Sequence, residues 1–470
     1  MPHRTQGRVS HQINSARQRL ASESGLPFSQ LLDHNLVEQA LAEDDGSFRE
    51  RLYTPATTLW IFLSQVLDPM QCCLQAVLRF LAHRLAQGLA PCSSETGAYC
   101  QARLRLPEGV VKRLMMATGQ QLHQREMPDA WRWKGRSVKL ADGTIVSMPD
   151  TPENQQEYPQ SRRQQPGVGF PAARMVVLFS LAVGTVLAAA IAACRGKQTG
   201  EASLLRTLCD HFEPGDVLLG DRIFCTYFDI ILLQERQVDT VVRLHQARRA
   251  DFRRGQRLGR DDHLVTWTKP ATRPQWLDQE TYQRLPDQMT VREVRVRVSI
   301  PGFRTKSLVV VTTLLDAAEY SARDLAELYR ARWHAELDLR SLKQTLQMDV
   351  LRCQTPAMVR KEIWTHFLAY NLIRKVMADA AEKHGILPRD LSFKSALETL
   401  LAFVPYMAPM SSVQAETYYV HLLDALARHR VGDRPDRCEP RVKKRRQKSY
   451  PYMQEPRAAA RKRYGKRPND

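Results

Sequence analysis

The sequence predicts an α/β fold in which a mixed β-sheet is flanked by helices and preceded by a helical region. Three observations support this prediction. Residues 1 to about 130 carry apolar side chains at helical spacing. From about residue 137, short apolar runs of strand length alternate with helical segments. The chain has 470 residues, of which 43% are hydrophobic and 25% are charged. It is therefore long enough to bury a sizeable core in two or three domains.

The first region, residues 1–130, is predicted to be helical. Helical periodicity is present in "TPATTLWIFLSQVL" (54–67), in "CCLQAVLRFLAHRLAQ" (72–87) and, after a break, in "GAYCQARLRLPEGVVKRLMMATGQQL" (97–122). A small helical DNA-binding domain has this pattern, and so does a helical scaffold. We interpret the region as a candidate DNA-binding domain.

The sheet is expected to begin with "SVKLADGTIVSM" (137–148) and to continue into Met175–Cys194. The latter stretch has no charged residue and is long enough to cross a bilayer as a helix. Gly184-Thr185 interrupts it near the middle, which favours two buried strands joined by a tight turn. We therefore predict no membrane span. A helix near 200–212 and strands at 217–219 and 238–244 complete a mixed α/β order.

Residues 245–304 form a basic, strand-rich insertion in this pattern. In "VREVRVRVSI" (291–300), valines alternate with Arg295 and Arg297, so one face of a strand can pack while the other presents guanidinium groups to phosphate. A charged edge strand that resists aggregation is the alternative. A buried strand, "SLVVVTTLL" (307–315), and a helix follow.

The formal net charge of +19 indicates a polyanionic partner, with nucleic acid first and a membrane surface second. Residues 430–470 contain 15 Lys or Arg and 5 Asp or Glu, a net charge of +10. We expect this basic tail to bind nucleic acid, with a solubilising tail as the alternative. The first 20 residues have no apolar core and the nine cysteines include no CxxC pair. Both features favour a cytoplasmic protein with reduced thiols.

The segment "YRARWHAELDLRSLK" (329–343) is predicted to be helical, with a polar stripe where an apolar one is expected. The stripe contains Tyr329, Arg332, Glu336, Arg340 and Lys343. Leucines flank it, and Trp333 beside it is expected to pack. Ordinary ion pairs one turn apart are the alternative explanation.

Two further acids, Asp142 and Asp221, follow apolar strand patterns in "LADGT" and "LLGDR". Each alone is typical of a turn or a helix cap. Together with Glu336 they would place three carboxylates at two strand ends and a nearby helix. This set of hard oxygen ligands suits two Mg²⁺ ions acting on a phosphodiester. Three basic neighbours, Arg222, Arg332 and Lys343, would hold the DNA backbone.

With these residues the sequence resembles the DDE transposases of bacterial insertion sequences, specifically the insertion sequence four family. The family signature, Tyr-x2-Arg-x3-Glu-x6-Lys, is matched by Tyr329, Arg332, Glu336 and Lys343. "DGT" (142–144) and "GDR" (220–222) resemble the family's other two acid motifs, in the right order. The resemblance extends to "TPATTLWIFLSQVL" near the N-terminus and to "EPRVKKRRQKSYP" (439–451) in the tail.

The resemblance implies an RNase H-like catalytic domain at residues 131–429, with the β-rich insertion at 245–304 and the basic tail at 430–470. It implies that Asp142, Asp221 and Glu336 bind two Mg²⁺ ions. The expected activity is cleavage of double-stranded DNA at the inverted repeats of a transposon and strand transfer into target DNA, by a homodimer in the synaptic complex.

In the family a Trp stacks on a flipped base, a role for which Trp267 is the candidate here. Trp276 is a rival, and core packing is the alternative for both. Two other functions stay open. A catalytically inactive, transposase-derived DNA-binding protein is one, although the intact acid triad argues against it. A structure-specific RNase H-like nuclease is the other, and a requirement for terminal inverted repeats would distinguish it.

Overall fold

The computed structural model describes residues 32, 34–43, 52–297, 307–407, 410, 412–431 and 452–465. The chain divides into two compact units. We call Met1–Trp131, Ala182–Leu187 and Asp338–Val431 the helical unit, and Arg132–Leu181, Ala188–Leu337 and Gly432–Asp470 the sheet unit. These units divide the chain differently from the predicted domains, whose boundaries remain predictions.

The helical unit is built around α13, a 28-residue helix that packs against α3, α6, α14 and α15. Most of its side chains are buried because neighbours cover it on several sides. The N-terminal helices confirm the predicted helical region. The helices of this unit are α2 (His34–Ala42), α3 (Pro55–Leu67), α4 (Cys73–Ala86), α5 (Gly97–Arg105), α6 (Glu108–Gln124), η1 (Asp129–Trp131), α13 (Pro356–Lys383), η5 (Pro388–Asp390), α14 (Phe393–Met407) and α15 (Ser412–Ala427).

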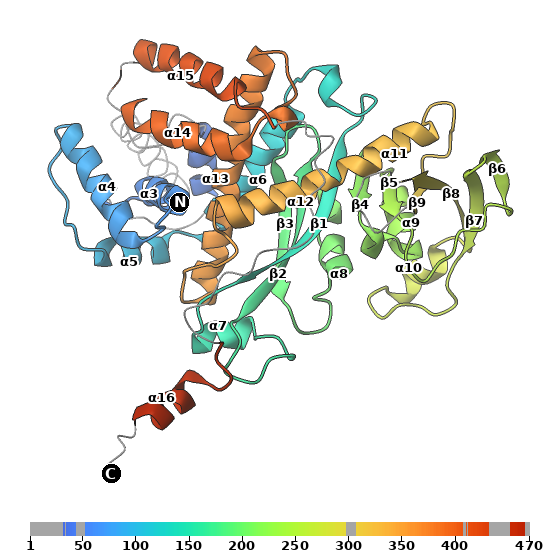
Figure 1. The fold of residues 1–470 in the computed structure, drawn as a ribbon, viewed down its shortest axis with the longest axis horizontal. Coiled ribbons are helices and arrows are strands. Elements are labelled where there is room, and N and C mark those ends of the chain that lie inside the picture. The colour runs from blue at the N-terminus through green and yellow to red at the C-terminus, as the bar shows by residue number, and fades with distance from the viewer. Residues whose placement is uncertain are drawn as a thin grey trace, which may run out of the picture. The chain divides into compact units, whose positions relative to one another are not determined.

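The sheet has nine strands in the order β3-β2-β1-β4-β5-β9-β8-β7-β6 (Figure 1). β1 pairs antiparallel with β2 and parallel with β4, β5 is parallel to β4, and β9 is antiparallel to β5. The strands are β1 (Val138–Ser147), β2 (Ala172–Ser180), β3 (Val186–Ala193), β4 (Val217–Gly220), β5 (Asp239–Arg243), β6 (Gln256–Gly259), β7 (Asp262–Thr268), β8 (Gln288–Arg297) and β9 (Ser307–Thr312). The predicted α/β class, a mixed sheet flanked by helices, is confirmed.

Short helices connect these strands. They are α7 (Pro152–Glu157), α8 (Glu201–Arg206), η2 (Cys209–His211), η3 (Arg222–Phe224), α9 (Tyr227–Glu235) and α10 (Gln279–Arg284). The stretch Met175–Cys194 forms β2 and β3, as predicted, and Gly184 in the connecting turn has a φ of +81° that side chains disfavour. Within the described ranges, no helix is both long and apolar enough to cross a membrane.

The tip of this turn is fixed inside the helical unit by Asn371 of α13. Its side-chain oxygen accepts a hydrogen bond from the Val186 N–H at 2.8 Å, and its amide nitrogen donates to the Val186 carbonyl at 2.8 Å and to the Met115 carbonyl at 3.0 Å. Asn371 is fully buried, and these bonds satisfy its amide.

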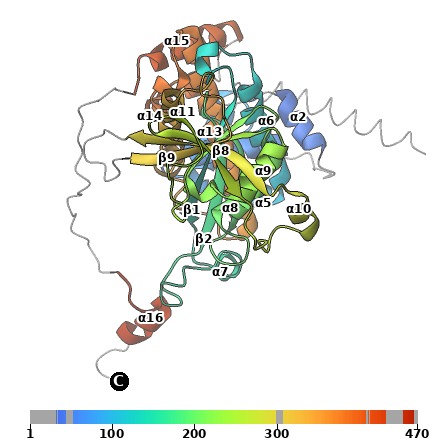
Figure 2. The ribbon, with the colours of Figure 1, turned by 90° about the vertical axis from the view of Figure 1, so that its right-hand side faces the viewer.

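The predicted insertion contributes β6, β7, α10 and β8, and its strands extend the same sheet beyond β9 (Figure 1). Figure 2 shows the paired strands β8 and β9 side by side. In β8, Val294 and Val296 are buried while Arg295 and Arg297 are exposed, as the alternation predicts. Both arginines pair with Asp261. Residues 298–306, which include Val298, lie outside the described residues.

The basic tail is described only at residues 452–465, which include the helix α16 (Arg457–Gly465). The remainder of the tail, with its "RVKKRRQK" run, lies outside the described residues. Its predicted contact with nucleic acid therefore stays a prediction.

Candidate active site

The register of two parallel strands places Asp142 beside Asp221. The paired positions of β1 and β4 end at Ala141 and Gly220, and the two aspartates are the next residues. Because neighbouring strands lie about 4.8 Å apart, the two aspartates lie side by side where the parallel pairing ends. The prediction that Asp142 ends its strand is wrong, since β1 continues to Ser147 by pairing with β2. Asp142 instead marks the end of the parallel pairing.

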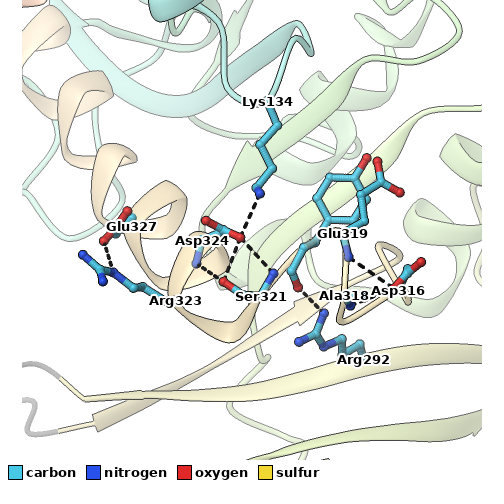
Figure 3. Close-up of polar contacts among 10 residues, drawn as sticks. Lys134, Arg292, Asp316, Ala318, Glu319, Ser321, Arg323, Asp324 and Glu327 are labelled. Carbon is cyan, nitrogen blue, oxygen red and sulfur yellow. Dashed lines mark hydrogen bonds and ion pairs between the residues drawn. The ribbon is translucent and has the colours of Figure 1, made fainter.

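The third acid is carried by a helical segment whose start is firmly anchored (Figure 3). At the start of α11 (Ala322–Ala331), Ser321 and Asp324 form a reciprocal capping box. Lys134 pairs with Asp324 at 3.0 Å. Arg292, fully buried, donates from Nη1 to the Tyr320 carbonyl at 2.6 Å. These contacts fix the entry of α11 against the sheet unit.

The single helix expected through the signature is interrupted at Arg332. α11 ends at Ala331, α12 spans Trp333–Arg340, and a π-helical turn (Ser341–Thr345) follows. Arg332 keeps helical backbone angles, with φ −53° and ψ −30°. Its N–H bonds to the Tyr329 carbonyl three residues back at 3.2 Å, which tightens the chain locally. The flanking leucines are buried as predicted, and they are Leu325, Leu328, Leu339, Leu342 and Leu346.

The guanidinium of Arg332 lies between two of the three predicted catalytic acids. Its Nη2 donates to Glu336 Oε1 at 2.7 Å, and its Nη1 lies 3.9 Å from Asp142 Oδ2. The side chains of Arg332, Asp142 and Glu336 are 18%, 20% and 37% exposed, so this group of charges is only partly solvated. The other oxygen of Asp142, Oδ1, accepts the Gly143 N–H at 2.8 Å.

Burial raises the pKa of Asp142 to about 6, and the negative charges of Glu336 and Glu201 act in the same direction. The Gly143 N–H and the Arg332 guanidinium oppose this rise. Burial also raises the pKa of Tyr329 to about 12, with Asp221 adding to the rise. Tyr329 is 7% exposed. The signature tyrosine is therefore a neutral phenol in the field of Asp221 and Arg332.

Sequence reasoning missed Glu201, the first residue of α8. Its carboxyl group covers the backbone of Gly143, where a Cβ would lie 2.6 Å from Glu201 Oε1 and 2.8 Å from Cγ. The sequence signal that could have found it was the glycine of "DGT". A glycine can indicate that another group lies close to the backbone, but it does not indicate which group.

The other predicted DNA-binding residues differ in their exposure. Arg222 is exposed in η3, directly after Asp221. Lys343 is half-buried in the π-helical turn, and its contact with DNA stays a prediction. Trp333 was expected to pack but is 43% exposed.

The structure favours packing over base stacking for Trp267. This side chain is 4% exposed, its Nε1 donates to Glu293 Oε1 at 3.1 Å, and the Arg248 guanidinium covers its ring at 3.9 Å. The indole is engaged on its edge and on one face, so base stacking by Trp267 stays a prediction that requires this side chain to be released. Trp276 is half-buried, with the Arg206 guanidinium 3.6 Å from its ring centre.

The three acids have the right chemistry for hard divalent cations, since all their donors are carboxylate oxygens. Across the residues that the structure describes, however, no three Asp, Glu, His or Cys side chains are grouped closely enough to hold a metal ion. Arg332 lies against two of these acids, with Nη2 2.7 Å from Glu336 Oε1 and Nη1 3.9 Å from Asp142 Oδ2.

Comparison with known proteins identifies the family of the chain. Residues 133–372 match the family described as "Transposase DDE domain". This match covers Asp142, Asp221 and Glu336 and more than half of the chain, so the chain belongs to the DDE transposase family.

Among individual relatives, the chain is 27% identical over 428 residues to "Transposase InsG for insertion sequence element IS4" of Escherichia coli (strain K12), covering 89% of this chain and 92% of that one. The resemblance to the insertion sequence four family is thereby confirmed. The "Transposase for insertion sequence element IS421" of Escherichia coli is 38% identical over 69 residues, 15% of this chain and 19% of that one. A piggyBac transposase synaptic complex with hairpin DNA aligns over 86% of this chain and 85% of that chain, with a TM-score of 0.41 and 10% identity.

Proposed function

We propose that this DDE transposase cleaves DNA at the inverted repeats of a transposon and joins the freed ends to target DNA, with Asp142, Asp221 and Glu336 as its catalytic acids. The observation that carries the proposal is the register of β1 and β4, which brings two acids together beside the segment bearing the third. Pairing two transposon ends calls for two copies of the chain in the working complex.

The proposal includes two Mg²⁺ ions held by these three carboxylates. Bound there, the ions would activate a water or a 3′-hydroxyl and stabilise the leaving oxygen at the phosphodiester. Asp142 and Asp221 offer oxygens from fixed strand positions, whereas Glu336 offers its oxygens from a helix. The half-exposed carboxylate of Glu336 leaves the site open to DNA.

The remaining polar residues would position the DNA. Arg332 can donate a planar pair of N–H groups to a phosphate, and Arg222 is exposed next to Asp221. The Tyr329 hydroxyl, kept neutral by burial, can donate a hydrogen bond to a phosphate oxygen without repelling it. Lys343 is proposed to contact the DNA near the scissile phosphate.

The test is cleavage of a linear duplex carrying the terminal inverted repeat that flanks the gene, with Mg²⁺ present. Asp142→Asn, Asp221→Asn and Glu336→Gln should each reduce cleavage by at least about a thousandfold and leave end binding within about threefold. Glu327→Gln is the matched control, because Glu327 is 51% exposed on α11 and pairs with the exposed Arg323 one turn away. Cleavage by Glu336→Gln at the wild-type rate would refute the proposal. Cleavage of duplexes that lack the repeat at the same rate would instead indicate the structure-specific nuclease.

A further inference from the structure

We infer that Arg332 has two alternative partners, the catalytic acids when DNA is absent and a DNA phosphate when DNA is bound, so that DNA binding and metal binding strengthen each other. This inference rests on the proposed function. It assigns to Arg332 a role as a positioning residue that controls when the acids are open to cations.

The first step is the geometry without DNA. Arg332 Nη2 holds Glu336 Oε1 at 2.7 Å, and Nη1 faces Asp142 Oδ2 at 3.9 Å. Asp142 Oδ1 is already committed to the Gly143 N–H at 2.8 Å. Both oxygens of Asp142 and one oxygen of Glu336 therefore face a hydrogen-bond donor or the guanidinium.

The second step concerns charge. Two partly buried carboxylates repel each other unless a cation lies between them. The guanidinium supplies that positive charge in the absence of a metal ion and holds Asp142 and Glu336 close together. A cation approaching the same oxygens meets a fixed positive charge, which weakens its binding.

The third step is the competing partner. A phosphate offers the guanidinium a charged, two-oxygen acceptor equivalent to a carboxylate. Arg332 has helical backbone angles at the junction of α11 and α12, so a rotation of its side chain can exchange acceptors without refolding the segment. Once the guanidinium turns to phosphate, the acids regain free oxygens and lose their counterion. By linkage, whatever DNA binding adds to metal affinity, metal binding adds to DNA affinity.

The experiment measures binding of Mn²⁺ alone, as a spectroscopic substitute for Mg²⁺, by the paramagnetic resonance signal of the free ion. Without DNA, Arg332→Gln should bind Mn²⁺ about tenfold more tightly than the wild type, because a unit positive charge has been removed from beside the acids. Arg332→Lys, which keeps a charge but lacks the planar fork, should fall between the two. Arg330→Gln is the matched control, because Arg330 is exposed on the last turn of α11, and it should behave as wild type.

The second arm adds a duplex carrying the terminal repeat, with the ions bound by the duplex alone subtracted. Wild-type Mn²⁺ affinity should rise to approach that of Arg332→Gln, whereas the affinity of Arg332→Gln should change little. Circular dichroism checks that each variant is folded. If Arg332→Gln does not fold, the comparison of wild-type Mn²⁺ affinity with and without duplex tests the inference.

Two results would overturn the inference: Arg332→Gln that binds Mn²⁺ no more tightly than wild type, or wild-type affinity that is indifferent to the duplex. Either result leaves the proposed function intact provided that Glu336→Gln still abolishes cleavage. Failure of that separate test would remove both.

Discussion

The carboxyl group of Glu201 occupies the space that a side chain on Gly143 would need. We expect Gly143→Ala to lower the free energy of unfolding by up to about 1 kcal/mol, because the Glu201 carboxyl must swing aside. In a Glu201→Ala background the same change should stabilise the protein by about 0.5–1 kcal/mol, since Ala is favoured over Gly inside a strand.

A double-mutant cycle on thermal unfolding measures this reversal of sign. Gly97→Ala is the control, because a Cβ at Gly97 meets no atom within 4 Å. Equal effects of Gly143→Ala in both backgrounds would show that Glu201 does not require the glycine.

The raised pKa of Asp142 predicts a pH-dependent stability of the metal-free protein. The pKa of this carboxyl rises from 3.8 to about 6 on folding, so between these values the folded state binds more protons than the unfolded state. Stability therefore falls as pH rises through this window, by at most about 3 kcal/mol. Asp142→Asn, which has no proton to lose, should gain stability relative to wild type from pH 4 to pH 6 and keep that gain above. Melting temperatures in the presence of a chelator test this, and a constant difference across the range would contradict it.

Asp338 is a fully buried acid in the helical unit that pairs with both Arg374 and Arg389. Asp338→Asn should destabilise the protein by about 3–5 kcal/mol, because it leaves two nearly buried guanidinium groups without a counterion. Asp424→Asn is the matched control. That acid is 38% exposed and pairs with Lys383, so its loss should lower the melting temperature much less. Similar melting temperatures for the two variants would show that the buried network contributes little.

Removal of residues 431–470 should weaken DNA binding regardless of the DNA sequence. This segment carries 14 basic and 5 acidic residues, and each phosphate that it neutralises adds about 0.9 to the slope of log affinity against log salt. The truncated protein should therefore bind with a shallower salt slope on both repeat and non-repeat duplexes. An unchanged slope would identify the tail as a solubilising extension.

The strands of the core were predictable because strands buried on both faces have uninterrupted apolar runs, such as Val217–Leu219. The turn at Gly184 was predictable from its residue type. Side-chain contacts were harder to predict from the sequence. Trp267 packs because Glu293, 26 residues further along the chain, accepts its N–H, and periodicity within one strand carries no information about such a partner. Trp333 is 43% exposed and follows and precedes half-buried residues, Arg332 and His334, so helical spacing alone did not indicate its exposure.

The predicted catalytic acids show the same difference between what sequence patterns predict and what they do not. The order and spacing of Asp142, Asp221 and Glu336 led to their prediction. They did not predict the Arg332 guanidinium that lies between two of them, or the tightened turn that places it. Helical spacing alone predicts an unbroken helix there. The break depends on a hydrogen bond to a carbonyl three residues back, which differs from the helical pattern by a single residue.

β9 pairs with core strand β5 on one edge and with insertion strand β8 on the other. The insertion therefore cannot be deleted without affecting the core sheet. Its deletion would remove the hydrogen bonds between β9 and β8 and make β9 an exposed edge strand, which could pair with other chains. Shortened relatives of this protein would need a new cover for that edge, and an engineer seeking a smaller enzyme should trim the hairpin of β6 and β7 first.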